Sequence, residues 1–225
     1  MFNFIGLGFT QIGYNTTDIQ QLRLSDGGAQ TIGWGGESFS IWAGAPAVVE
    51  GSDAFIYNDP SMDPNLEATD YYWGDELGNK TAFSIQPGQG VVVQMGADGI
   101  GVQTSGNVGR GPVTLTGVEM FNFLANPFPA AIDIQNVQIS DGGASTIGWG
   151  GESFSIWSGA PEVVAGSDAF IYNDPSMDPN LEATDYYWGD ELGNKSTYPI
   201  ACGQSFVIQV GAPGLEFTIT PPYAL

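Results

Sequence analysis

The sequence predicts an all-β protein of two tandem antiparallel β-sandwich domains, jelly-roll-like in outline. A long segment occurs twice at a fixed offset, which indicates a duplicated domain. The 33 Gly and 14 Pro separate short apolar runs, as the turns between short strands require. Lys and Arg, which favour helices, number only 4 together, whereas Thr, Val and aromatic residues, which favour strands, are plentiful.

The duplicated segment is residues 25–80, which recurs as residues 140–195 at an offset of 115. Only four pairs of residues differ between the two copies: Gln30/Ser145, Ala43/Ser158, Ala47/Glu162 and Glu50/Ala165. The offset is longer than any solenoid repeat, so it indicates two copies of one domain. We therefore predict a first domain at residues 1–110 and a second at residues 111–225, each large enough to bury its own core.

Short apolar runs, many with alternating polarity, define the strands that we expect in the first domain. They are residues 1–9, 19–24, 31–34, 37–42, 54–57, 81–85, 91–95 and 100–103. Turn sequences such as Asp26-Gly27-Gly28 separate them, and the Gly-rich residues 106–111 predict a flexible join between the domains. The second domain repeats this plan. About eight short strands per domain, with turns between them, are typical of a sandwich or jelly roll.

One predicted strand has no counterpart. Residues 112–117 (Pro-Val-Thr-Leu-Thr-Gly) lie between the two copies, and no matching segment occurs before Met1 or after Leu225. If this strand completes one domain, the other domain has an unpaired strand edge, which can pair with a strand of another chain. The alternatives are that a matching strand was trimmed from the chain or that residues 112–117 only link the domains.

The chain is strongly acidic, with a net charge of −21 and four basic residues, Arg23, Lys80, Arg110 and Lys195. Nucleic acids and anionic membranes bind Lys and Arg, so the composition argues against both as partners. An acidic surface favours solubility and attracts cations. It also offers trypsin-like proteases few cleavage sites, which suits an extracellular or cell-surface location. An acidic surface that serves only as an adaptation to a salty medium is the alternative interpretation.

Residue types that several kinds of catalysis need are missing. The chain contains no His, which excludes Ser-His-Asp and Cys-His chemistry and the common zinc sites. Cys202 is alone, so no internal disulfide can form, and Pro87 occupies its place in the first copy. No signal peptide is visible, and the apolar runs are too short to span a membrane. We predict a protein that is not an enzyme and does not insert into membranes.

Acidic residues are concentrated after the strand predicted at residues 54–57 and after its repeat. Calcium takes roughly six to eight oxygen ligands in flexible loops, and carboxylates at short spacing can supply them. The candidate ligands are Asp59, Asp63, Glu67, Asp70, Asp174, Asp178, Glu182 and Asp185. The spacing is not that of an EF-hand, and a solvated acidic loop without metal is the alternative. A glycosidase also needs two carboxylates, but the domain is small for such an enzyme.

Aromatic residues recur at the same places in both copies, and rigid aromatic side chains dominate many interfaces. The candidates for contacts between subunits are Phe2, Phe4, Tyr71, Tyr72, Trp73, Tyr186, Tyr187 and Trp188. If the Tyr-Tyr-Trp run is a strand, its side chains alternate between faces and at least one ring points outward. Exposed rings would also suit stacking on sugars, and packing in the core is the alternative for most of the aromatic residues.

Two short motifs of the second copy resemble a β-sandwich module of secreted bacterial surface proteins. That module opens with Asn-Pro-(Phe/Tyr)-Pro at a strand end, as at residues 126–129, and closes with a Gly-Gln-Gly-Phe strand, similar to Gly-Gln-Ser-Phe at residues 203–206. The first copy keeps Gly88-Gln89-Gly90 but lacks the Asn-Pro motif. The resemblance implies a cell-surface or extracellular setting and implies no activity.

Together these observations predict an extracellular structural protein, a subunit that self-assembles into a filament or surface layer. Strand edges and aromatic contacts would join the subunits, and calcium would bridge the acidic loops. Heterologous contacts that do not close generate filaments, and two like domains in tandem favour this geometry. The alternative is a pair of carbohydrate-binding modules on a cell surface. The expected partners are therefore other copies of this chain or glycans.

Overall fold

The computed structural model describes residues 2–6, 9–10, 16–25, 38–40, 53–58, 71–95, 101–140, 152–159, 162–173 and 186–223. In these residues the regular structure consists of short β-strands and two 3₁₀ helices, which confirms the all-β prediction.

Residues 1–110, the predicted first domain, contain a five-stranded antiparallel sheet. Its strands, in spatial order, are β1 (Phe2–Gly6), β9 (Gly90–Gln94), β5 (Ser38–Ser40), β6 (Ala54–Asn58) and β7 (Tyr71–Gly74). Three strand pairs accompany it: β10 (Gly101–Gln103) with β4 (Arg23–Ser25), β3 (Thr17–Asp18) with β8 (Ser84–Ile85), and β2 (Phe9–Thr10) with β11 (Asn107–Val108). β11 lies in the predicted flexible join, so pairing with β2 fixes part of that join to the first domain.

The second domain repeats the five-stranded sheet with corresponding strands in the same order. They are β13 (Met120–Ala125), β22 (Ser205–Val210), β16 (Ser153–Ser155), β19 (Ala169–Asn173) and β20 (Tyr186–Gly189). A three-stranded sheet contains β12 (Val113–Thr116), β23 (Glu216–Ile219) and β15 (Val137–Ser140), in the order β12-β23-β15. Two strand pairs complete the description: β14 (Ile132–Asp133) with β21 (Pro199–Ile200), and β17 (Trp157–Gly159) with β18 (Glu162–Val163).

Each domain buries an apolar cluster of its own. In the second domain, Phe154 of the five-stranded sheet and Phe217 of the three-stranded sheet belong to the same cluster and are almost fully buried. An edge-to-face contact recurs in both domains: Phe39 and Trp73 have ring centroids 6.0 Å apart at 64°, and Phe154 and Trp188 have centroids 5.9 Å apart at 61°. The duplicated sequence therefore builds the same aromatic core twice.

The prediction of a strand at residues 19–24 is wrong for the first half of that range. Ile19–Gln21 forms a 3₁₀ helix, η1, and only the residues of β4 that follow are extended. The reason is a cap: the Asp18 carboxylate accepts the backbone N–H of Gln20 at 2.7 Å, which favours a turn over a strand. The second domain has the same 3₁₀ helix, η3 (Ile134–Asn136), capped by Asp133. The strand predicted at residues 81–85 is also shorter, and the one predicted at residues 31–34 lies outside the described residues.

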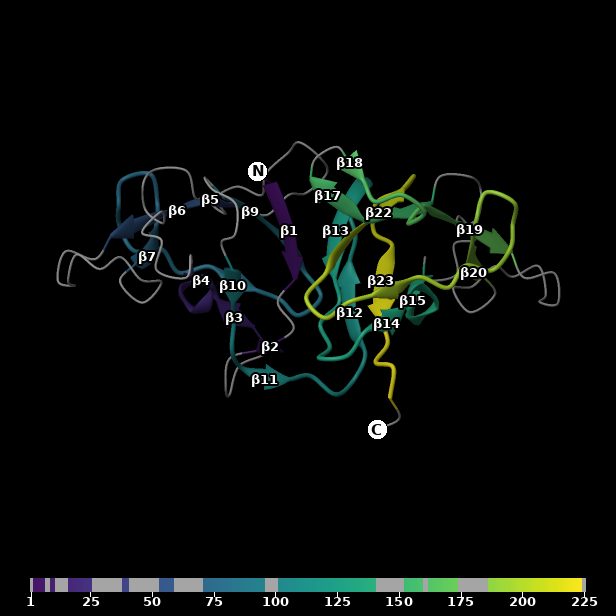
Figure 1. The fold of residues 1–225 in the computed structure, drawn as a ribbon, viewed down its shortest axis with the longest axis horizontal. Coiled ribbons are helices and arrows are strands. Elements are labelled where there is room, and N and C mark those ends of the chain that lie inside the picture. Colours follow the sequence, from purple (N-terminus) through teal and green to yellow (C-terminus); the bar gives the residue numbers. More distant parts are fainter. Residues whose placement is uncertain are drawn as a thin grey trace.

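The two domains lie side by side, with β1 and β13 near the centre of the molecule (Figure 1). β6 and β7 lie toward one end of the long axis, and β19 and β20 lie toward the other (Figure 1). Two isolated bridges join the domains, Ile5 with Gln204 and Gln89 with Leu124. Ile5 corresponds to Leu124, and Gln89 corresponds to Gln204. Each bridge therefore joins the same two positions with the domains exchanged, which is the pattern of an approximate two-fold relation between the domains.

Candidate assembly interface

The clearest difference between the domains is the number of strands in one sheet. In the second domain, β23 pairs with β15 on one side and with β12 on the other. In the first domain, β10 and β4 correspond to β23 and β15 in the same register, with Gly101 opposite Ser25 as Glu216 is opposite Ser140. No strand among the described residues occupies the place of β12 beside β10. The prediction that residues 112–117 form a strand is confirmed by β12, which pairs with β23. We call the side of β10 on which no described strand pairs the open edge.

A hydrogen bond on the β15 side of β23 shows which backbone groups of β23 face β12 on its other side. The Thr220 N–H donates to the Asn136 carbonyl oxygen at 2.9 Å, on the side of β15. Backbone groups of successive residues in a strand face opposite sides. Phe217 and Ile219 therefore direct their N–H and C=O groups toward β12, and their partners in the register are Leu115 and Val113.

By the same register, Val102 directs its backbone groups toward the open edge, because it corresponds to Phe217. We expect the same of Thr104, which follows β10 directly at the position of Ile219. Phe217 is fully buried, but Val102 is only half-buried. The Thr104 hydroxyl oxygen is buried with no hydrogen-bond partner in the described part of the chain. Among the described residues, β10 therefore lacks the cover that β12 gives to β23 in the second domain.

The surroundings of two corresponding glycines show the same difference. A Cβ atom placed on Gly88 would lie 3.1 Å from Val113 Cγ1 and 3.2 Å from Leu115 Cδ1, so β12 packs directly on this glycine. A Cβ atom placed on Gly203 would meet only the Gly6 carbonyl oxygen, at 3.2 Å, within 4 Å. No described side chain covers Gly203 as β12 covers Gly88.

A hydrogen-bonded turn follows β7 and recurs after β20. The Asp75 carboxylate accepts the backbone N–H groups of Leu77 at 2.9 Å and Asn79 at 2.8 Å. The Asn79 side chain and backbone are the main cause that lowers the pKa of Asp75 below its ordinary value, and the Leu77 N–H adds to it. Asp190 makes the same contacts with Leu192 and Asn194, and its pKa is lowered for the same reasons.

Stacked tyrosines support each turn. Tyr57 and Tyr72 face each other across β6 and β7, with ring centroids 5.6 Å apart, and donate hydroxyl hydrogens to the Asp75 and Gly78 carbonyl oxygens. The second domain repeats this with Tyr172 and Tyr187, whose centroids are 5.7 Å apart. The turn after β7 leaves Leu77 86% exposed, and Leu192 in the turn after β20 is also 86% exposed. The four tyrosine hydroxyls therefore donate their hydrogens within the protein.

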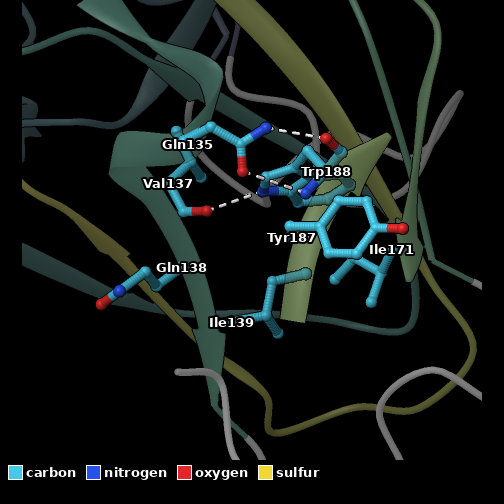
Figure 2. A pocket seen from close by; sticks show the side chains of 7 residues that line it. All are labelled: Gln135, Val137, Gln138, Ile139, Ile171, Tyr187 and Trp188. Carbon is cyan, nitrogen blue, oxygen red and sulfur yellow. Dashed lines mark hydrogen bonds between the residues drawn. The ribbon is translucent and has the colours of Figure 1, made fainter. Parts of the chain in front are cut away.

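A glutamine outside the identical segment fixes each buried tryptophan. The Gln135 amide donates to the Trp188 carbonyl oxygen at 2.7 Å and accepts the backbone N–H of Trp188 at 3.1 Å (Figure 2). It also donates to the Ser196 carbonyl oxygen at 2.7 Å. The Trp188 indole N–H donates to the Val137 carbonyl oxygen at 2.7 Å (Figure 2). Gln20 makes the matching bonds in the first domain. Sequence reasoning did not identify this pair of glutamines, although their recurrence at the offset of 115 was the available signal.

A small hollow lies beside this contact, between β15, β19 and β20 (Figure 2). Its volume is about 30 Å³, and Gln138, Ile171 and Tyr187 are among the residues that line it. A hollow of this size can hold a water molecule.

The predicted aromatic contacts separate into three groups. Trp73 and Trp188 are 2% and 3% exposed, so their assignment to a contact between subunits is wrong, and they are core residues. The burial has a physical cause, since each indole N–H finds a backbone carbonyl inside the domain. Tyr72 and Tyr187 are half-buried in the stacked pairs. The side chains of the other four candidates lie outside the described part of the structure: Phe2, Phe4, Tyr71 and Tyr186.

The eight predicted calcium ligands lie outside the described residues: Asp59, Asp63, Glu67, Asp70, Asp174, Asp178, Glu182 and Asp185. Within the described part of the chain, no group of three acidic or cysteine side chains is arranged to hold a metal ion. The same part contains no helix that is both long and apolar enough to cross a membrane. Cys202 is exposed in the turn before β22.

The chain matches no family model, and comparisons with curated proteins and with solved structures also find no match.

Proposed function

We propose that this protein is an extracellular structural subunit that assembles with copies of itself into a filament or surface layer. The contact between subunits is the addition of a strand at the open edge of β10. The observation that supports this is the comparison of the two domains, since β12 lies beside β23 in one and no described strand occupies the matching place beside β10 in the other. An unpaired edge exposes backbone donors and acceptors that an extended segment of another chain can pair with.

The second domain indicates which segment would fit. In β12, Val113 and Leu115 are partly buried against the core, whereas Thr114 and Thr116 are exposed. An added strand therefore needs apolar residues at two alternate positions, over the core, and polar residues between them. It would pair with Val102 and Thr104, whose backbone groups face the open edge.

The contact is heterologous, because the corresponding edge in the second domain is already paired with β12. A heterologous contact that does not close on itself produces an open chain of subunits. This favours a filament or a layer over a two-fold dimer.

Electron microscopy of two matched variants tests the proposal. Val102→Pro removes an N–H that faces the open edge, and Pro is tolerated at strand edges, where it blocks pairing. Thr114→Pro makes the same change on the outer side of β12, where the register turns the Thr114 N–H away from β23. We expect the wild type and Thr114→Pro to form ordered assemblies and Val102→Pro to remain dispersed. Circular dichroism of both variants checks that they fold. Equal assembly of a folded Val102→Pro contradicts strand addition at β10.

The calcium part of the proposal is supported by composition alone: a net charge of −21 and the acidic segments that precede β7 and β20. Assemblies that dissolve when a chelator removes calcium, and form again when calcium is restored, would support bridging by the metal. Assemblies that are unchanged by the chelator would leave strand addition in place and exclude calcium from the contact.

A further inference from the structure

The surface between the two domains is built from corresponding residues that are not identical. The Gly6 N–H donates to the Gly203 carbonyl oxygen at 2.9 Å, and the Ala125 N–H donates to the Gly88 carbonyl oxygen at 2.9 Å. Gly6 ends β1 as Ala125 ends β13, and Gly88 corresponds to Gly203 at the offset of 115. The two hydrogen bonds are therefore copies of each other under the approximate two-fold relation. We call this surface the domain interface.

At two places in the domain interface, corresponding residues of the two domains lie against each other, and each place has room for the side chain of only one of them. A Cβ atom added to Gly6 would lie 1.9 Å from the Ala125 Cβ and 3.2 Å from the Ala125 Cα. Gly90 shows the same restriction, because its Cβ would lie 2.6 Å from the Ser205 Oγ and 2.9 Å from the Phe123 carbonyl carbon. Gly90 and Ser205 also correspond at the offset of 115. In both pairs the first domain has glycine and the second domain has the side chain.

The side chains of the second domain are fixed in place. The Ser205 hydroxyl donates to the Leu124 carbonyl oxygen at 2.9 Å in a buried hydrogen bond, so the Oγ atom loses that bond if it turns away. The Ala125 Cβ is attached directly to the backbone and is fully buried. Neither contact can be relieved by rotation of a flexible side chain, so only a movement of the strands would make room.

We propose that the Gly6–Ala125 and Gly90–Ser205 pairs make the domain interface specific for one partner. The surface of a second domain fits the surface of a first domain and excludes that of another second domain, because two alanines and two serines cannot occupy the same space. Two first domains would fit sterically but would leave both places empty, which loses packing contacts. Two copies of this chain that exchange domains must therefore pair first domain with second. This inference concerns a different surface from the open edge of β10 and does not depend on strand addition.

The pairs matter because the domains came from one sequence. Identical copies would have presented the same surface twice, and two identical surfaces can pair with each other. The side chain in each pair removes that possibility for the second domain, and the glycine leaves the first domain able to receive that side chain. Specificity of this kind depends on a clash in the wrong pairing as much as on contacts in the right one.

The test uses the full chain with Gly6→Ala, with the exchange Gly6→Ala/Ala125→Gly, and with Gly211→Ala as the control. Gly211 has no atom within 4 Å of an added Cβ, so this control adds a methyl group in open space. We expect Gly6→Ala to lower the Tm by roughly 2 to 12 °C, the range for an overpacked contact in a chain of this size. The exchange should restore the Tm to within about 2 °C of the wild type, since it moves the methyl group to the other side of the same space.

Amide hydrogen exchange gives a second measurement that is local to the domain interface. The N–H groups of residues 6 and 125 both donate across it. We expect their exchange to become about tenfold faster or more in Gly6→Ala and to return to the wild-type rate in the double variant. If Gly6→Ala does not fold, the double variant alone decides, because the proposal requires it to fold like the wild type. An unchanged Tm in Gly6→Ala, or a double variant as unstable as the single one, would overturn the proposal.

Discussion

Replacing Gln135 by Ala tests the contact that holds η3 against β20. The Gln135 side chain makes three hydrogen bonds to backbone groups, two through its N–H₂ and one through its oxygen. A net contribution of about 0.5 to 1.5 kcal/mol per bond predicts a loss of roughly 3 kcal/mol in the free energy of unfolding. The loss reflects the Trp188 N–H and the carbonyl groups left unpaired in a partly buried place.

Denaturant unfolding followed by tryptophan fluorescence measures this loss, and calorimetry should show a Tm lower by about 6 to 12 °C. Gln138→Ala is the matched control, because Gln138 is exposed on β15 nearby. Gln20→Ala should cost a similar amount in the first domain, where the corresponding bonds are 2.7, 2.5 and 3.1 Å long. A loss below about 1 kcal/mol for Gln135→Ala, or an equal loss for Gln138→Ala, would refute the reasoning.

Two further predictions concern the turns after β7 and β20. The lowered pKa of Asp190 means that its carboxylate stabilises the fold above the ordinary value of 3.8 and that this stabilisation is lost as the pH falls through the folded-state pKa. The stability difference between wild type and Asp190→Asn should therefore be largest above pH 3.8 and shrink below it, and an NMR titration that places the Asp190 pKa at or above 3.8 would contradict this. Tyr172→Phe removes the hydroxyl that donates to the Asp190 carbonyl oxygen at 2.8 Å, which should cost about 1 kcal/mol in denaturant unfolding. No loss in that variant would mean that the hydroxyl bonds equally well to water.

The sequence contains enough to predict the class of fold and the repetition of its strands. The identical segments place β6 with β7 and β19 with β20 in the same register, as equal sequences require. Residues 112–117 were also predictable as a strand, because alternating Val, Thr and Leu between Pro and Gly fit no other element so well.

What the sequence did not predict depends on contacts between distant residues. Gln20 and Trp73 are 53 positions apart, so no local pattern shows that the glutamine ties the tryptophan into the core. The same contact explains why an aromatic residue expected at a subunit contact is buried instead. The Asp18 cap was visible only as one polar residue before an apolar one, and alternation over residues 19–24 favoured the wrong element. Gly6 shows its role only when Ala125 is seen beside it.

Amide hydrogen exchange at the open edge tests the central claim most directly, since the two domains provide an internal comparison. In the dispersed protein, the N–H groups of Val102 and Thr104 should exchange rapidly, whereas those of Phe217 and Ile219 should be protected by β12. On assembly, Val102 and Thr104 should become protected. Protection of Val102 and Thr104 in the dispersed protein would show that another part of the chain already covers the edge and would contradict the account.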